Sequence, residues 1–181
     1  LIGQMGADLF AFPHGIHVDQ EGNVWVTDPL PPDGRGDGGN VGQQVTKLSP
    51  DGEILLQLGT LKVTGNGPNE FSSPSDVVVG RNGDIFVADG HAEGTNERVM
   101  KFDRNGRFIM EWGRPGNGAC GTGEFSSLHA LDIDSQGRLF IGDRDNNRIQ
   151  IYDQDGNYLD CWYQFSRPSG IYIDADDNMF V

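Results

Sequence analysis

The chain has 181 residues, enough for one domain with a sizeable core, and its formal net charge of −14 argues against nucleic acid or an anionic membrane surface as a partner. Twenty-seven glycines and nine prolines beside 36% hydrophobic residues favour many short strands joined by tight turns over helices or disorder. No apolar run approaches the ~18 residues of a membrane-spanning helix, so we expect no membrane insertion.

A pair of short alternating segments recurs along the chain. It first occurs as PHGIHVDQEGNVWVTD (residues 13–28) and returns at residues 74–89, 128–143 and 168–181. Each copy has apolar residues at every second position on both sides of a Gly- or Asn-containing turn, which is typical of an antiparallel hairpin. We expect the apolar residues of the second strand to be buried between sheets, namely Val24, Val26, Ile85, Val87, Leu139 and Ile141.

A second predicted hairpin follows each of the first three copies, so the repeating unit has four antiparallel strands. The predicted units, or blades, cover residues 13–59, 74–113 and 128–162. Repeated four-stranded units of about 40–45 residues indicate a β-propeller, because one sheet cannot bury both of its faces alone. A solenoid of hairpins is the structural alternative. The predicted fold class is therefore all-β, a propeller of four-stranded antiparallel blades.

Both ends of the chain match parts of further blades. Residues 1–12, beginning LIGQMG, match the last strand of a blade, and residues 168–181 match the first two strands. We expect a fragment of a six-bladed ring, since an open arc leaves unpaired edges; self-association through those edges is the alternative. The insertion at residues 29–40 is predicted to be a surface loop, because its prolines and glycines cannot hold a strand ladder.

The residue that precedes the first strand of each unit alternates along the chain: His14, Ser75, His129 and Ser169. In a propeller these positions surround the central channel. Alternate blades of a six-bladed ring are three-fold related, so a third histidine is expected beyond Val181. Three imidazoles around one axis form the ligand set of a catalytic zinc site, although chance could also place two histidines here.

Two resemblances to known families add to this pattern. The aspartate that closes the second strand, followed by a basic residue in the third, resembles the NHL repeat. The segments FPHGIHVDQEGNVWVTD, PSDVVVGRNGDIFVADG, GEFSSLHALDID and GDRDNNRIQIYDQDG resemble peptidyl-α-hydroxyglycine α-amidating lyase, a six-bladed propeller. The resemblance implies zinc at His14 and His129, calcium at the backbone carbonyl of Ile16, and a pocket lined by Arg144. It also favours a secreted or periplasmic location.

The chain departs from the lyase pattern after VADG, where the family has a tyrosine and this chain has His91. Imidazole can also carry a proton near neutral pH, so His91 is the candidate acid–base residue. Arg144 is the candidate for binding a substrate carboxylate, with a structural ion pair as the alternative. Ser75 and Ser169 are expected to reach the channel and contact substrate without touching the ion.

Three functions fit these features. The first is a metal-dependent lyase that releases a short oxo acid from a small molecule or peptide at the channel mouth. The second is a noncatalytic NHL propeller that binds a protein or peptide. The third, a calcium-dependent lactonase-like propeller, is disfavoured because the channel positions hold His and Ser rather than acidic residues. Cys120 and Cys161 form either one disulfide or two free thiols, and the family's own disulfides do not match them.

Overall fold

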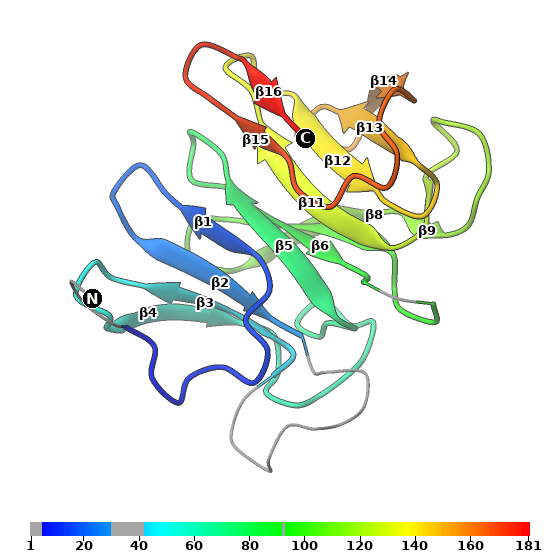
Figure 1. The fold of residues 1–181 in the computed structure, drawn as a ribbon. Helices are drawn as coiled ribbons and strands as arrows, with labels where there is room; N and C mark the ends of the chain where they lie inside the picture. Colours follow the sequence, from blue (N-terminus) through cyan, green and yellow to red (C-terminus); the bar gives the residue numbers. More distant parts are fainter. Residues whose placement is uncertain (1–4, 30–41, 92) are drawn as a thin grey trace.

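The computed structural model describes residues 5–29, 42–91 and 93–181, which form a curved array of β-sheets (Figure 1). The first sheet contains β1 (Ile16–Val18), β2 (Val24–Asp28), β3 (Gln44–Leu48) and β4 (Ile54–Leu58). The second contains β5 (Pro74–Val79), β6 (Ile85–Asp89), β7 (Arg98–Phe102) and β8 (Phe108–Trp112). The third contains β11 (Leu128–Ile133), β12 (Leu139–Asp143), β13 (Arg148–Tyr152) and β14 (Tyr158–Trp162).

Two shorter ladders complete the described strands. β15 (Tyr172–Ile173) and β16 (Met179–Phe180) form an antiparallel pair after the third sheet. β9 (Arg114–Pro115) and β10 (Glu124–Phe125) form a parallel pair at the base of the loop that joins the second and third sheets.

The strand order confirms the predicted blades. Strands within each four-stranded sheet follow chain order and pair antiparallel, over the three predicted ranges. The described residues contain no helix, and thus none that could cross a membrane. The predicted loop at 29–40 falls outside the described residues except for Pro29, and so do the first four residues of LIGQMG.

Aspartates shape the turns that join neighbouring strands. Asp103 Oδ1 accepts hydrogen bonds from the backbone N–H groups of Asn105 and Arg107, two and four residues later. Asp153 Oδ1 does the same with Asp155 and Asn157. Such a carboxylate closes the turn locally, which is the ordinary role of aspartate in turns. Some of the chain's many acidic residues therefore stabilise turns by accepting backbone hydrogen bonds.

Apolar side chains fill the spaces between adjacent sheets. Trp25, Val87 and Met100 belong to the cluster between the first and second sheets, whereas Phe86 belongs to the next cluster. Successive residues of a strand point to opposite faces, so each middle strand contributes to two cores. The buried members of the cluster between the second and third sheets are Val78, Phe86, Ala88, Val99, Phe125, Leu128, Leu131, Leu139, Ile141 and Tyr152.

Five of the six predicted core residues are confirmed as buried, and Val24 is the exception. Ile85 and Leu139, at the equivalent position of the later sheets, are fully buried against the sheet that precedes them. Val24 is only partly buried, because it lies in the first sheet and no described sheet precedes it.

Carboxylates also connect the innermost strands of adjacent sheets. Asp76 in β5 accepts a hydrogen bond from the backbone N–H of Leu131 in β11 at 2.8 Å. Asp132 in β11 accepts one from Ile173 in β15 at 2.6 Å. Burial, with a smaller contribution from the negative charge of Asp132, raises the pKa of Asp76 to about 7. These bonds hold successive inner strands in a fixed relation around the channel.

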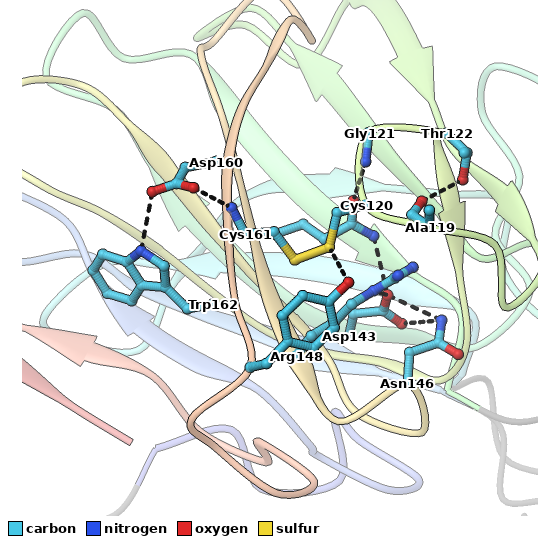
Figure 2. The surroundings of a disulfide bond; sticks show 12 residues. Ala119, Cys120, Gly121, Thr122, Asp143, Asn146, Arg148, Asp160, Cys161 and Trp162 are labelled. Carbon is cyan, nitrogen blue, oxygen red and sulfur yellow. Dashed lines mark hydrogen bonds and ion pairs between the residues drawn. A yellow bond between two sulfur atoms is a disulfide. The ribbon is translucent and has the colours of Figure 1, made fainter.

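A disulfide joins Cys120 to Cys161, which decides between the two alternatives left by the sequence (Figure 2). Cys120 lies in the loop between β9 and β10, and Cys161 lies in β14, with 6.2 Å between their Cα atoms. Arg148 anchors the same loop, because its guanidinium donates to the carbonyl oxygen of Gly118 at 2.7 Å. The loop is therefore attached to the third sheet at two points.

We expect the Cys161→Ser variant to lose about 3–4 kcal/mol of unfolding free energy, because the cross-link closes a loop of 41 residues and restricts the unfolded chain. Denaturant unfolding of variant and parent without reductant measures the difference. With reductant present, the two proteins should unfold at similar midpoints. Equal midpoints without reductant would mean that the disulfide does not stabilise the fold.

Candidate metal centre and active site

Three histidines from different parts of the chain meet near the start of the innermost strands β1 and β11. His14 precedes β1, His91 follows β6, and His129 lies in β11. Their ring centroids are 4.5–4.9 Å apart in all three pairs. One nitrogen of each ring lies within 4.8 Å of the corresponding nitrogens of the other two. The predicted proximity of His14 and His129 is confirmed.

Backbone carbonyls of the neighbouring repeat orient two of these rings. His14 Nδ1 lies 2.7 Å from the carbonyl oxygen of Ser75, and His129 Nδ1 lies 2.9 Å from that of Ser169. A carbonyl can only accept a hydrogen bond, so Nδ1 carries the proton in both rings. The lone pair of Nε2 is then free, which is the arrangement usual for metal-binding histidines. The alternation of His and Ser along the chain therefore pairs each histidine with an acceptor in the next repeat.

The two serines differ in what their hydroxyls contact. The Ser75 hydroxyl is fully buried and donates to the carbonyl of Leu128 at 2.7 Å, so a substrate contact by this hydroxyl does not fit the structure. Ser75 instead contributes its carbonyl to His14. The Ser169 hydroxyl is exposed and bonds to the carbonyl of Arg167 at 3.2 Å. Its contact with substrate stays a prediction.

His91 lies directly against His129, with 3.2 Å between the two Nε2 atoms. Two lone pairs at this distance repel one another, so the nitrogens must share either a proton or a cation. Burial, with a smaller contribution from the positive charge of Arg144, lowers the pKa of both His91 and His129 to about 4. Both rings are therefore neutral at pH 7 and able to donate lone pairs.

The closing aspartates of the repeats fix the backbone that leads to the histidines. Asp28 accepts the backbone N–H of Phe12 at 2.6 Å, two residues before His14. Asp143 accepts the N–H of Ser126 at 2.7 Å, three residues before His129. These bonds place the start of each inner strand relative to the end of its neighbour, which explains the recurrence of aspartate at this point of the repeat.

Arg144 lies beside the histidines with its terminal amino groups unengaged by the described residues. Its Nε is 3.4 Å from Asp145, and no ion pair to a neighbouring sheet is found among the described contacts. Arg148, four residues later, contrasts with it: Nε contacts Asp143 at 2.6 Å and both Nη atoms donate to carbonyls. Arg148 thus maintains the fold, whereas Arg144 has donors left for a ligand.

Ile16 and His17 lie one and two positions beyond Gly15 at the start of β1. Ile16 is 70% exposed and lines a cavity of about 630 Å³ along the channel-facing strands. Calcium at its carbonyl stays a prediction from the resemblance. His17 is partly buried and lies outside the group of three histidines.

The sequence analysis did not predict His91 as a metal ligand. The repeat register predicted only His14 and His129, with a third histidine in a later blade. His91 instead follows Asp89 and Gly90 in the β6–β7 connection, on the same side as the residues that precede the inner strands. Its place just after the closing aspartate was the available signal.

Comparison with known proteins agrees with the fold. A family model described as a 6-bladed beta-propeller matches residues 81–164. The chain is 38% identical over 159 residues to peptidyl-glycine alpha-amidating monooxygenase A of Xenopus laevis, covering 85% of this chain and 16% of that protein. The family-model match covers less than half of the chain, and amidating proteins are among the chain's homologues.

Two further relatives are more similar in length. A probable peptidyl-alpha-hydroxyglycine alpha-amidating lyase of Caenorhabditis elegans is 35% identical over 158 residues, covering 84% of this chain and 40% of the relative. Human NHL repeat-containing protein 3 is 35% identical over 178 residues, covering 93% and 48%. The chain thus spans less than half the length of these relatives. A streptogramin B lyase structure has the same fold, with a TM-score of 0.62 at 18% identity over 93% of this chain and 47% of that one.

Proposed function

We propose that this propeller is a metal-dependent lyase-like enzyme in which His14, His91 and His129 hold a zinc ion. The convergence of the three imidazoles is the observation that carries the proposal. Zinc–nitrogen bonds of ~2.0–2.1 Å place nitrogens that share one tetrahedral ion roughly 3–3.5 Å apart. The 3.2 Å between the Nε2 atoms of His91 and His129 fits that spacing. Protonation of Nδ1 in His14 and His129 leaves their Nε2 lone pairs available for the ion.

The same residues divide the work on a substrate. When bound, zinc supplies Lewis acidity toward a substrate hydroxyl or carbonyl. Arg144 offers its two terminal amino groups to a carboxylate, for which the planar guanidinium is well suited. His91 cannot hold a proton and a cation on the same Nε2, and its contact with His129 favours the role of nitrogen donor.

The proposed substrate class rests on homology to an amidating lyase and on the unengaged terminal amino groups of Arg144. We infer a molecule with an N-linked α-hydroxy acid at its end, in which the carboxylate binds Arg144. In the reaction the C–N bond breaks, the hydroxyl carbon becomes a carbonyl, and the hydroxyl proton is transferred to the departing amide nitrogen. The products are an amide and a short oxo acid such as glyoxylate.

Arg144→Gln should lower kcat/KM for a peptide ending in α-hydroxyglycine by about 10–100-fold, because a charge-assisted hydrogen bond is lost. Mass spectrometry of amide and glyoxylate formation by the full-length protein measures this. Arg107→Gln is the matched control, since Arg107 pairs with Asp103 on an exposed hairpin away from the histidines. If the zinc-loaded parent protein forms neither product, the assignment as a lyase is wrong and a noncatalytic binding propeller becomes the better description.

A further inference from the structure

We propose that Asp145 and Arg167 set the charge that the site presents to its substrate, which makes Arg167 a specificity-determining residue for an anionic ligand. This inference rests on the proposed role of Arg144 in binding a carboxylate. Arg167 lies in the connection between β14 and β15, whereas Arg144 and Asp145 follow β12. The three residues therefore join two adjacent blades beside the histidines.

A single carboxylate oxygen is shared unequally by the two arginines. Asp145 Oδ1 lies 2.6 Å from Nη1 of Arg167 and 3.4 Å from Nε of Arg144. The shorter contact assigns most of the negative charge of Asp145 to Arg167. The group of three residues keeps one net positive charge, and that charge resides on Arg144, whose terminal amino groups are unengaged by the described residues.

The fold holds Arg167 where this pairing is possible. Its backbone N–H donates to Oδ1 of Asn147 at 3.1 Å, and Asn147 belongs to the same connection as Asp145. Two residues after Arg167, the carbonyl of Ser169 accepts the bond from His129. The segment is therefore attached on one side to the histidines and on the other to the connection that carries Arg144.

The ion pair contributes little to folding. The side chains of Arg167 and Asp145 are 58% and 39% exposed. Pairs of this kind are worth at most about 1 kcal/mol, so variants of either residue are expected to fold. Without Arg167, the carboxylate of Asp145 has only Arg144 as a cationic partner among these residues. An anionic ligand would then have to displace Asp145 from Arg144 before binding.

The experiment compares four variants of the full-length, zinc-loaded protein: Arg167→Gln, Arg167→Lys, Asp145→Asn and the double variant Asp145→Asn/Arg167→Gln. Glyoxylate binding by calorimetry at low salt is the first measurement, and zinc affinity by chelator competition is the second. We expect Arg167→Gln to weaken glyoxylate binding about tenfold, the equivalent of 1.4 kcal/mol. Arg167→Lys keeps the charge and should stay close to the parent.

The double variant separates charge from structure. Removing the carboxylate of Asp145 leaves Arg144 without a competitor, so the double variant should bind glyoxylate as tightly as the parent or more tightly. Zinc affinity should not change in any variant, because the acceptor carbonyl of Ser169 remains. The inference is overturned if Arg167→Gln binds glyoxylate like the parent, if the double variant is as weak as Arg167→Gln, or if the parent binds no carboxylate.

These outcomes are independent of the lyase assignment. Cleavage of the hydroxyglycine peptide without any effect of Arg167→Gln would leave the proposed function standing and refute this inference. The expected pattern of glyoxylate binding in a protein that cleaves no such peptide would do the opposite.

Discussion

Replacing His14 or His129 by alanine should abolish tight zinc binding. The loss in affinity should exceed the ~10–100-fold that removal of an orienting partner alone costs, because a nitrogen donor itself is removed. Each variant leaves two imidazoles of the group of three, which is fewer protein ligands than catalytic zinc sites use. Competition with a chromophoric chelator measures the affinity of the full-length protein, and circular dichroism verifies that each variant is folded.

His17→Ala provides the control for this series. His17 lies three positions after His14, at the centre of β1, and is not part of the group of three. Its replacement should leave zinc affinity unchanged. An equal loss in His17→Ala would show that the effect arises from disturbance of β1 and would refute the assigned ligands.

His91→Ala distinguishes the two roles open to this residue. As the third nitrogen donor, His91 is needed for affinity, and its loss should weaken zinc binding about as much as the loss of His14. If His91→Ala binds zinc like the parent but loses activity, the residue is instead the proton carrier that the sequence first indicated.

Asp143→Ala should lower the free energy of unfolding by about 3–5 kcal/mol, because it leaves the guanidinium of Arg148 buried without its counter-charge. Asp143 is fully buried and receives hydrogen bonds from Ser126, Asn146, Arg148 and Gln150. Removing the carboxylate therefore also leaves several donors unsatisfied. Denaturant unfolding gives the difference.

Asp155→Ala is the comparison for this prediction. Asp155 also contacts a cation, Lys101, at 3.4 Å, but its side chain is 80% exposed. Asp155 lies in solvent, and Lys101 keeps its shorter contact with Asp84 at 3.2 Å, so the variant should unfold within about 1 kcal/mol of the parent. Similar losses in the two variants would mean that burial of Asp143 does not account for its contribution.

The blades were predictable because their determinants are local. Alternating apolar residues and an aspartate-led turn lie within a few residues of one another in each hairpin, and the pattern returns along the chain. The predicted burial of Val24 was wrong for the same reason. Ile85 and Leu139 are buried against a preceding sheet, and a local sequence pattern does not show whether such a sheet is present. The pairing of Cys120 with Cys161 likewise depends on where the fold brings a loop and a strand together.

The site was predictable only where it follows the repeat register. His14 and His129 occupy the same position in their repeats, so one argument located both. His91 lies in a connection whose length differs among the repeats, and no register extends to it. Ser75 was predicted to contact substrate, but its hydroxyl bonds to the carbonyl of Leu128 and its own carbonyl lies at His14. The repeat register does not reveal this contact between a backbone atom and the neighbouring repeat.

The hydrogen bonds from His14 to Ser75 and from His129 to Ser169 bear on how such a protein can be duplicated or recombined. Each bond crosses from one repeat to the next, so a blade moved into another propeller would bring a histidine and leave its acceptor behind. The smallest segment that carries both a histidine and its acceptor therefore spans the boundary between two blades. A grafted or duplicated segment that retains the orientation of its histidine must extend through the first strand of the blade that follows.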